Sequence, residues 1–303
     1  MEIFRKMSFA DSTGDAIPFY HEGKYHIFSL TSPSGTTVYP ARLRTTWSHS
    51  VSDDLVHWEE LPTALYPGEG DEPDASGVWT GSVIYGEGKY HAFYTGYCLT
   101  AEYQQTICHA TSDDGITWVK DAANPVITPM IELYEKLDWR DPYVFYNEED
   151  KCYWILISAR RLDMPITRRG CIVLYRSKDL VNWEYMTDII SRKQNLEDGD
   201  IRYLDGTLYY FFEMEDYDKG PSKICVMESA DYGMTWSEPK TLLPNEADNE
   251  MASCEKTADG WRLYVSSDLA CVGESYQGAS VYYCDYTDEF EPVELYVKSA
   301  VPD

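Results

Sequence analysis

The chain has 303 residues, and its apolar fraction of 44% is enough to build a hydrophobic core, which excludes a disordered protein. Its formal net charge of −27 argues against nucleic acid and against an anionic membrane surface as partners, because both are negatively charged themselves. Aromatic residues make up 15% of the chain; they favour half-buried strands and also offer flat faces on which sugar rings stack.

The first recurring feature along the chain is a β-hairpin signal. In each copy an acidic or glycine-containing turn is followed by a strand rich in aromatic residues, and turn dipeptides between alternating apolar runs are the strongest short-range sign of a hairpin. The five copies are Glu22-Gly23-Lys24-Tyr25-His26, Glu87-Gly88-Lys89-Tyr90-His91, Glu149-Asp150-Lys151-Cys152-Tyr153, Leu204-Asp205-Gly206-Thr207-Leu208-Tyr209 and Ala258-Asp259-Gly260-Trp261. They predict five hairpins.

A second signature alternates with the hairpins and combines a serine, an aspartate and a tryptophan. Its copies run from Ser52 to Trp58, Ser112 to Trp118, Ser177 to Trp183 and Ser229 to Trp236, with a degenerate fifth copy from Cys284 to Phe290. The aspartates are expected to bond backbone amides of their turns, and the tryptophans to fill the space between neighbouring sheets. Self-similarity at roughly 60 residues is typical of a β-propeller. We therefore predict an all-β, five-bladed β-propeller that forms a single catalytic domain over residues 1–303.

Three acidic residues are the candidates for catalysis. Asp15, Asp141 and Glu197 stand eight or nine residues before three of the predicted turns. An equal offset would place them at equivalent positions on the innermost strands of three blades, where they would converge on the central axis. Two carboxylates on either side of a glycosidic bond, one protonating and one attacking, form the usual apparatus of sugar cleavage. Each acid taken alone could equally be a turn cap or a strand-end surface residue.

Other polar residues near these acids are candidates for substrate binding. Arg140 precedes Asp141 and could hold a carboxylate ionised while it hydrogen-bonds a polar substrate. Glu250 stands before the fifth turn and is the rival of Glu197 for the role of general acid. The remaining polar candidates are His49, Thr80, Ser82 and Asp200.

Three aromatic residues, Trp47, Trp79 and Tyr94, are expected near the mouth of a central funnel. Aromatic walls there would stack on a sugar ring while the acids bind its polar edge. A propeller axis admits the end of a chain more readily than its middle, so we expect a pocket for one terminal sugar. The alternative is that these aromatic side chains pack between blades, and we expect this for at least one of them.

Signals for other ligands and compartments are missing from the sequence. The N-terminal residues show no signal peptide, and no apolar stretch approaches the roughly 18 residues of a membrane span. The eight cysteines are scattered without a C-x-x-C pair, and the six histidines show no metal-ligand spacing. We therefore expect a cytoplasmic protein with reduced thiols, no metal and no cofactor, whose partner is a small carbohydrate.

Several motifs resemble glycoside hydrolase family 32, the invertases, inulinases and levanases of clan J. The segment from Trp47 to Trp58 followed by Leu61-Pro62-Thr63-Ala64-Leu65-Tyr66-Pro67 is similar to that family, as is Trp79-Thr80-Gly81-Ser82-Val83. The similarity continues in Asp113 to Trp118, Asn124-Pro125-Val126-Ile127, Arg140-Asp141-Pro142 and Tyr175 to Leu180. It extends over about positions 14 to 236.

The resemblance implies a five-bladed propeller that cleaves β-fructofuranosides with retention of configuration. In that picture Asp15 would be the nucleophile, Asp141 the stabiliser of the transition state and Glu197 the acid/base. The chain departs from the family at Leu30, where a substrate-binding glutamine is usual, and at Asp198, where a cysteine is usual. We expect the family's C-terminal β-sandwich to be lacking, because Asp303 is the last residue, and such a loss would be compatible with a homo-oligomer.

Three alternatives remain open from the residues alone. A relative of glycoside hydrolase family 43 would also have five blades and would cleave arabinofuranosides or xylosides with inversion. A sialidase is suggested by the Ser112 and Ser229 signatures, but five hairpins are too few for six blades. A non-catalytic sugar-binding propeller is the third alternative, and it would need no proton donor.

Overall fold

The computed structural model describes residues 2–5, 10–33, 44–166, 169–191, 195–216, 220–243, 249–267 and 280–293. Its elements are β-strands that form five four-stranded antiparallel sheets. Blade 1 contains β2 (Ala10–His21), β3 (Lys24–Pro33), β4 (Thr46–Ser52) and β5 (Trp58–Leu65), and blade 2 contains β6 (Gly77–Gly86), β7 (Lys89–Tyr97), β8 (Gln105–Ser112) and β9 (Val119–Lys120). Blade 3 contains β10 (Tyr134–Asn147), β11 (Cys152–Arg161), β12 (Gly170–Ser177) and β13 (Glu184–Ser191), and blade 4 contains β14 (Asn195–Leu204), β15 (Thr207–Asp216), β16 (Gly220–Ser229) and β17 (Lys240–Leu243).

The fifth blade combines strands from both ends of the described sequence. Its order is β18 (Asn249–Thr257), β19 (Gly260–Ser267), β20 (Ser280–Tyr286) and β1 (Glu2–Arg5). Strand β1 pairs antiparallel with β20, so the N-terminal strand supplies the outer edge of the last blade. This pairing closes the ring, because neighbouring blades otherwise follow one another directly in the sequence.

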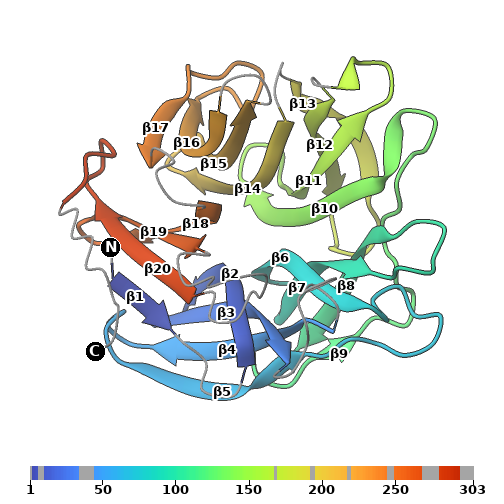
Figure 1. The fold of residues 1–303 in the computed structure, drawn as a ribbon, viewed down its shortest axis with the longest axis horizontal. Helices are drawn as coiled ribbons and strands as arrows, with labels where there is room; N and C mark the ends of the chain where they lie inside the picture. The colour runs from blue at the N-terminus through green and yellow to red at the C-terminus, as the bar shows by residue number, and fades with distance from the viewer. Residues whose placement is uncertain are drawn as a thin grey trace.

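The five blades surround a central axis (Figure 1). Strands β2, β6, β10, β14 and β18 are innermost, and each contacts the innermost strand of both neighbouring blades, which makes a closed ring. The predicted all-β, five-bladed β-propeller is therefore confirmed.

Hairpin chemistry explains the tight turn between the first two strands of several blades. Glu22 and Gly23 connect β2 to β3 with φ angles of 48° and 82°. Positive φ at both central residues defines the type I′ turn, whose twist matches that of the flanking strands. Asp205 and Gly206 repeat this geometry in blade 4, with φ angles of 49° and 85°. The glycine in each pair adopts this region at little cost.

The serine–aspartate–tryptophan signature has the structural role that the sequence predicts. In its first copy, Asp54 Oδ1 accepts hydrogen bonds from the backbone N–H groups of Val56 and His57. In its second copy, the Trp118 ring packs edge-to-face on Phe28 of the preceding blade, with ring centroids 5.8 Å apart. The aspartate thus closes a turn while the tryptophan fills the seam between two blades.

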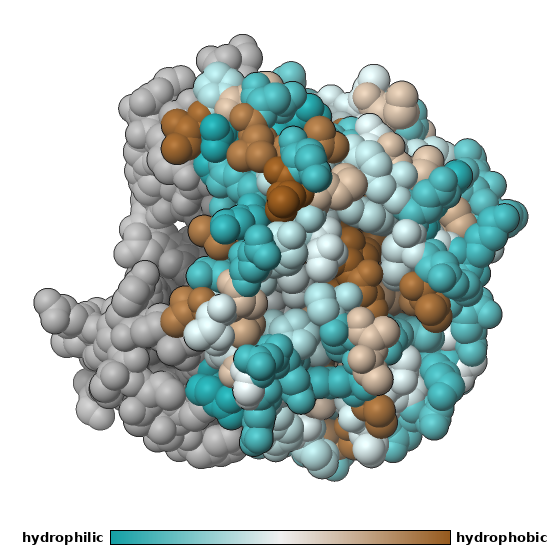
Figure 2. Space-filling view, turned by 90° about the vertical axis from the view of Figure 1, so that its right-hand side faces the viewer, coloured by the Kyte–Doolittle hydropathy of each residue, from teal (hydrophilic) through white to brown (hydrophobic). Residues whose placement is uncertain are grey.

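Hydrophilic residues lie mainly on the surface, and the cysteines lie in the interior, as the composition suggests. Hydrophilic residues cover most of the described face in Figure 2, with smaller hydrophobic patches between them. Seven of the eight cysteines are buried and free, and Cys271 lies outside the described residues. Within the described part of the chain, no helix is long and apolar enough to cross a membrane.

Two neighbouring blades each contain a pair of histidines, of which His26 is half-buried and the other three are buried. His26 Nδ1 lies 2.9 Å from His49 Nε2 in blade 1, and His91 Nδ1 lies 3.0 Å from His109 Nε2 in blade 2. Phe28 stacks on the second histidine of the first pair, as Phe93 does in the second pair. Burial lowers the pKa of His26 and of His91 to about 4 in each case, from an ordinary value of 6.5.

These histidines are expected to make the fold sensitive to acid. A histidine whose pKa is lower in the folded state stabilises the protein fully above pH 6.5, and this stabilisation is lost as the pH falls towards 4. Between pH 7 and pH 4, the free energy of unfolding should fall by about 2 kcal/mol less in the double variant His26→Gln and His91→Gln than in the wild type, after allowance for solvent screening. Urea unfolding at a series of pH values measures this difference.

The comparison between variants is needed because buried carboxyl groups act in the opposite direction. Burial raises the pKa of Glu255 to about 7, so protonation of Glu255 relieves a destabilising charge as the pH falls. If the free energy of unfolding falls equally with pH in the wild type and in the double variant, His26 and His91 do not cause the sensitivity to acid.

Candidate active site

A β-bulge interrupts each of the five innermost strands at nearly the same height. One extra residue on the inner strand shifts the register between Gly14 and Ala16 in β2 and between Arg140 and Tyr143 in β10. The corresponding shifts in the other blades fall between Val78 and Gly81, Glu197 and Asp200, and Glu250 and Ala252. Bulges re-aim side chains and are frequent next to active sites. All three predicted catalytic residues lie within or directly beside these bulges.

The bulges correct the expectation that the three acids share one offset. Asp15 and Asp141 each lie six residues before the last paired residue of their strand, whereas Glu197 and Glu250 each lie seven residues before it. The acid of blade 4 at the same position as Asp15 and Asp141 is therefore Asp198. Glu197 and Glu250 form a second equivalent pair, one residue upstream. The side chains of these two glutamates lie outside the part of the chain whose side chains are described.

Asp15 and Asp141 both occupy strained backbone positions. Their φ angles are 31° and 55°, a region that residues with a side chain rarely adopt. Such strain costs of order 1–3 kcal/mol and persists only where the surroundings over-determine it. Both residues sit in the bulge itself, so the strain accompanies the turning of each side chain out of the regular strand pattern.

A chain of hydrogen bonds through blade 2 connects these two acids. The Thr80 hydroxyl donates to Asp15 Oδ2 at 2.7 Å, and the Thr80 carbonyl accepts from the Thr95 hydroxyl at 3.0 Å. Thr95 Oγ1 in turn accepts the backbone N–H of Asp141 at 2.8 Å. Ser82 adds a second clamp, since its hydroxyl donates to the Pro142 carbonyl at 2.8 Å. Blade 2 thus holds the acids of blades 1 and 3 in fixed relation.

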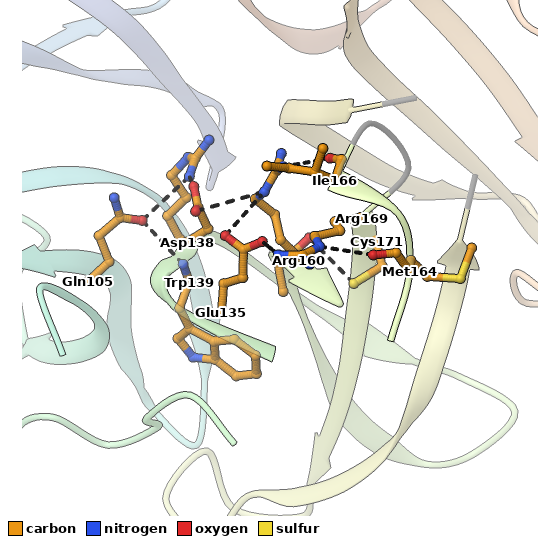
Figure 3. A network of polar contacts seen from close by, with 11 residues as sticks. Gln105, Glu135, Asp138, Trp139, Arg160, Met164, Ile166, Arg169 and Cys171 are labelled. Carbon is orange, nitrogen blue, oxygen red and sulfur yellow. Dashed lines mark hydrogen bonds and ion pairs between the residues drawn. The ribbon is translucent and has the colours of Figure 1, made fainter. Parts of the chain in front are cut away.

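Arg140 sits beside the buried Asp141 and is itself anchored. Its Nε lies 3.4 Å from Asp141 Oδ2, and its NH1 group donates to Asp138 Oδ1 at 2.8 Å. Figure 3 shows Asp138 on the side of the network that also contains Gln105, whose Oε1 accepts the backbone N–H of Trp139 at 3.2 Å. The guanidinium is therefore held between two carboxylates rather than free to swing.

The same network continues outward along the edge of blade 3 (Figure 3). Arg160 Nε lies 3.5 Å from Glu135 Oε2 and 3.9 Å from Asp138 Oδ2. Glu135 Oε1 also accepts from Arg169 NH1 at 2.6 Å. Charges of alternating sign in such a row stabilise one another, which gives Arg140 a rigid support.

A second buried charge cluster lies beneath the acids and joins blades 4 and 5. Arg202 NH1 lies 2.6 Å from Asp200 Oδ1, and Arg202 Nε donates to the Cys254 carbonyl at 2.7 Å. Asp200 Oδ2 accepts the Cys254 backbone N–H at 2.7 Å. Burial raises the pKa of Asp200 to about 6, against the opposing effect of Arg202. The Arg202 guanidinium also lies over the Tyr143 ring, 4.9 Å from its centroid.

A small cavity of about 20 Å³ lies between these two groups of residues on the inner strands. Asp141, Thr80, Asp200 and Arg202 are among its lining residues. This volume is enough for one water molecule with several polar partners and is too small for a sugar ring. The cavity is therefore part of the structure that supports the catalytic acids and is not the substrate pocket.

Several residues predicted to bind substrate are buried in the protein instead. Trp47 and Tyr94 are 1% and 0% exposed within one hydrophobic cluster between blades 1 and 2, so they do not form walls of a funnel mouth. His49 is buried against His26 and Phe28. These placements follow from the inward-facing alternation of central strands, which sequence motifs do not reveal.

Of the remaining candidates, two support the site from the interior, and three lie closer to the acids or are partly exposed. Ser82 and Asp200 are buried and hydrogen-bonded to backbone groups, which makes them supports rather than substrate ligands. Thr80 is buried but bonds Asp15 directly. Trp79 is half-buried and stacks on Tyr97, with centroids 4.0 Å apart. Arg140 is also half-buried and contacts Asp141.

Sequence reasoning missed several residues that position this site. Thr95, Asp138 and Arg202 belong to no repeated motif, although each lies close in sequence to an inner-strand bulge or faces one from the next strand. Within the described residues, no group of three or more histidine, cysteine, aspartate or glutamate side chains is arranged to hold a metal ion.

Comparison with known proteins agrees with this architecture. The family described as "Glycosyl hydrolases family 32 N-terminal domain" matches residues 16–205, a segment that begins one residue after Asp15 and includes Asp141 and Glu197. The levanase of Bacillus subtilis (strain 168) is 35% identical over 178 residues, which cover 56% of this chain and 23% of that protein. An insoluble β-fructofuranosidase isoenzyme of Arabidopsis thaliana is 34% identical over 171 residues, which cover 55% of this chain and 30% of that protein.

Solved structures show the same fold over a longer stretch. A GH32 β-fructofuranosidase of Bombyx mori, solved as a mutant in complex with sucrose, superposes with a TM-score of 0.72 at 20% identity. The superposition covers 92% of this chain and 61% of that one. The chain thus spans less than a third of each of the two curated relatives that it matches and about three fifths of the solved one.

Proposed function

The chain belongs to glycosyl hydrolase family 32, and from this premise we propose that it hydrolyses a terminal β-fructofuranoside such as sucrose or a short fructan. The observation that carries the proposal is the hydrogen-bonded path from Asp15 through Thr80 and Thr95 to Asp141. It holds two acids of different blades in fixed relation. A retaining glycosidase needs a fixed nucleophile, and a fixed negative charge beside it favours the positive charge that develops on the sugar ring.

We assign the nucleophile to Asp15. Its carboxylate would attack the anomeric carbon while Glu197 gives a proton to the glycosidic oxygen, so that the leaving sugar departs as a neutral alcohol. The product of this step is a covalent fructosyl ester on Asp15. Glu197 would then take a proton from water, the water oxygen would attack the same carbon, and the Asp15 carboxylate would be released. Two displacements at one carbon retain its configuration.

The geometry of Asp141 suits a stabilising role. Its carboxylate is buried beside Arg140, and its backbone is fixed by Thr95, so it is poorly placed to move towards a reacting atom. A fixed negative charge favours the positive charge that develops on the sugar ring in the transition state. Because Arg140 is anchored by Asp138, it can offer a donor to a substrate hydroxyl without reorganisation.

A substrate screen tests this function. We expect the wild-type protein to release fructose from sucrose, from short fructans or from both, and Asp141→Ala to lose this activity. In the presence of methanol, retention predicts methyl β-fructofuranoside as the transfer product. If the pocket takes a single terminal sugar, monosaccharide should form from a polymeric fructan within the first minutes.

Two results would contradict the proposal in different ways. Cleavage of arabinofuranosides or xylosides with inverted products, and none of fructosides, would point to the family 43-like alternative. Early accumulation of mixed oligosaccharides from a fructan would leave the fructosidase activity intact but would exclude a pocket that admits only chain ends.

A further inference from the structure

A pocket of about 390 Å³ lies on the outside of the propeller, in the seam between blades 1 and 2. The end of β5 and the residues around β9 form it, and both strands lie at the outer edge of the molecule, away from the inner strands that carry Asp15 and Asp141 (Figure 1). We call it the seam pocket; its principal lining residues are Leu65, Tyr66, Glu69, Glu72, Trp118 and Lys120. Its volume falls within the roughly 300–1,000 Å³ of small-molecule sites.

The loop that forms one wall of the seam pocket is rigidly built. Its centre is the buried Asp74, which accepts hydrogen bonds from the Tyr94 hydroxyl at 2.8 Å and from the Gly68 backbone N–H at 3.2 Å. Arg44 ties the same loop down through the Gly68 and Ala75 carbonyls, at 3.3 and 3.2 Å. The wall is therefore preformed, which lowers the entropic cost of binding a ligand.

Glycine is required where this loop approaches its own carboxylates. A Cβ atom at Gly68 would lie 2.0 Å from Glu72 Oε2 and 2.5 Å from Asp74 Oδ1, distances far below van der Waals contact. The tight approach brings the Glu72 carboxylate to the rim of the seam pocket. Lys120 supplies the opposite charge, since its Nζ lies 2.5 Å from Asp74 Oδ2 and has two further N–H donors.

Two aromatic rings complete the seam pocket. Trp118 is held in place by its edge-to-face contact with Phe28. Tyr66 lines the pocket and is 62% exposed, so one face of its ring is available to a ligand. A sugar ring has apolar faces and an edge that carries hydroxyl groups. The aromatic rings of the seam pocket suit the faces, and the fixed donors and acceptors suit the hydroxyl groups.

The charges of the seam pocket select among ligands. Glu69 and Glu72 disfavour an anion, as does the net charge of −27 on the whole chain. Lys120 disfavours a cation in the same space. We propose that the seam pocket is a second carbohydrate-binding site, which holds one or two units of a neutral oligosaccharide or polysaccharide away from the catalytic acids. That the sugar is a fructan rests on the proposed function.

Affinity gel electrophoresis tests this site without relying on catalysis. The wild-type protein is run in gels that contain inulin, levan, arabinan or xylan, all neutral polysaccharides. We expect at least one of them to retard it, and Tyr66→Ala to weaken the retardation at least tenfold in polysaccharide concentration. Because the Tyr66 ring is largely exposed, its removal should leave the thermal unfolding midpoint unchanged.

Two control variants separate the seam pocket from other surfaces. Tyr20→Ala removes another exposed aromatic ring, on β2, and should be retarded like the wild type. Asp141→Ala disables the proposed catalytic site and should also be retarded normally, whether or not the protein cleaves fructosides. No retardation of the wild type by any of the four polysaccharides, equal retardation of Tyr66→Ala, or loss of retardation in Asp141→Ala would each overturn the proposal.

Discussion

Replacement of Asp15 by asparagine is expected to lower kcat for fructoside hydrolysis by a factor of about 10³ or more, since an amide cannot form the covalent ester. The effect is large because Asp15 is the proposed nucleophile, and without a nucleophile the first bond-forming step cannot take place. Asparagine keeps the shape of the side chain, and its Oδ1 can still accept the Thr80 hydroxyl. The fold should therefore be unaffected, and thermal unfolding checks this.

The matched control for Asp15→Asn is Asp259→Asn, which changes an exposed aspartate in a hairpin turn and should retain full activity. A more informative control is Thr80→Val, which keeps the size of Thr80 but removes its hydroxyl. We expect Thr80→Val to lower kcat about tenfold, because it removes one hydrogen bond that positions the Asp15 carboxylate without deleting the carboxylate itself. Full activity in Asp15→Asn would show that another residue attacks, and Asp198 would be the next residue to test.

Periodic features of the sequence predicted the architecture correctly. Turn dipeptides such as Glu22-Gly23 and Asp205-Gly206 require positive φ, and this local need is visible without any tertiary information. The tryptophan signatures mark seams between blades for a similar reason, because the contact of Trp118 with Phe28 is repeated one blade later by that of Trp183 with Phe93. Repetition makes a weak local signal readable, so the number of blades could be counted from the sequence.

The finer arrangement of the site could not be predicted in the same way. Each β-bulge inserts one residue into an inner strand, so counting residues back from a turn is uncertain by one position. That uncertainty is enough to confuse the position of Glu197 with that of Asp198. Asp15 and Asp141 occupy equivalent positions because their strands have the same spacing from bulge to turn.

Burial was the second property that the sequence did not show. Trp47 and Tyr94 have the chemistry of sugar-stacking residues, yet both lie on middle strands of their sheets, β4 and β7, and face the seam between blades 1 and 2. The exposed ring beside a preformed pocket is Tyr66, which lies in the family-like segment from Leu61 to Pro67 but was not among the predicted binding residues. Aromatic residues serve both packing and binding, so only the three-dimensional arrangement separates the two roles.

The largest expected effect on stability concerns the buried pair between Asp200 and Arg202. Asp200→Ala is expected to lower the free energy of unfolding by about 3–5 kcal/mol, because it removes the buried carboxylate that pairs with the largely buried Arg202 guanidinium. The Cys254 backbone N–H loses its acceptor in the same variant, which weakens the contact between blades 4 and 5. Urea unfolding, followed by tryptophan fluorescence, measures the change.

The double substitution Asp200→Leu with Arg202→Met tests whether Asp200→Ala is destabilising because it leaves an unpaired charge on Arg202 or because it removes packing contacts. Replacing both partners by apolar residues removes the uncompensated charge, so the double variant should recover much of the stability lost in Asp200→Ala. The recovery should be incomplete, because Arg202 also bonds the Cys254 carbonyl and lies over Tyr143. If Asp200→Ala is instead as stable as the wild type to within about 1 kcal/mol, the pair does not hold the two blades together. The stability of the ring would then rest on the apolar contacts between the sheets.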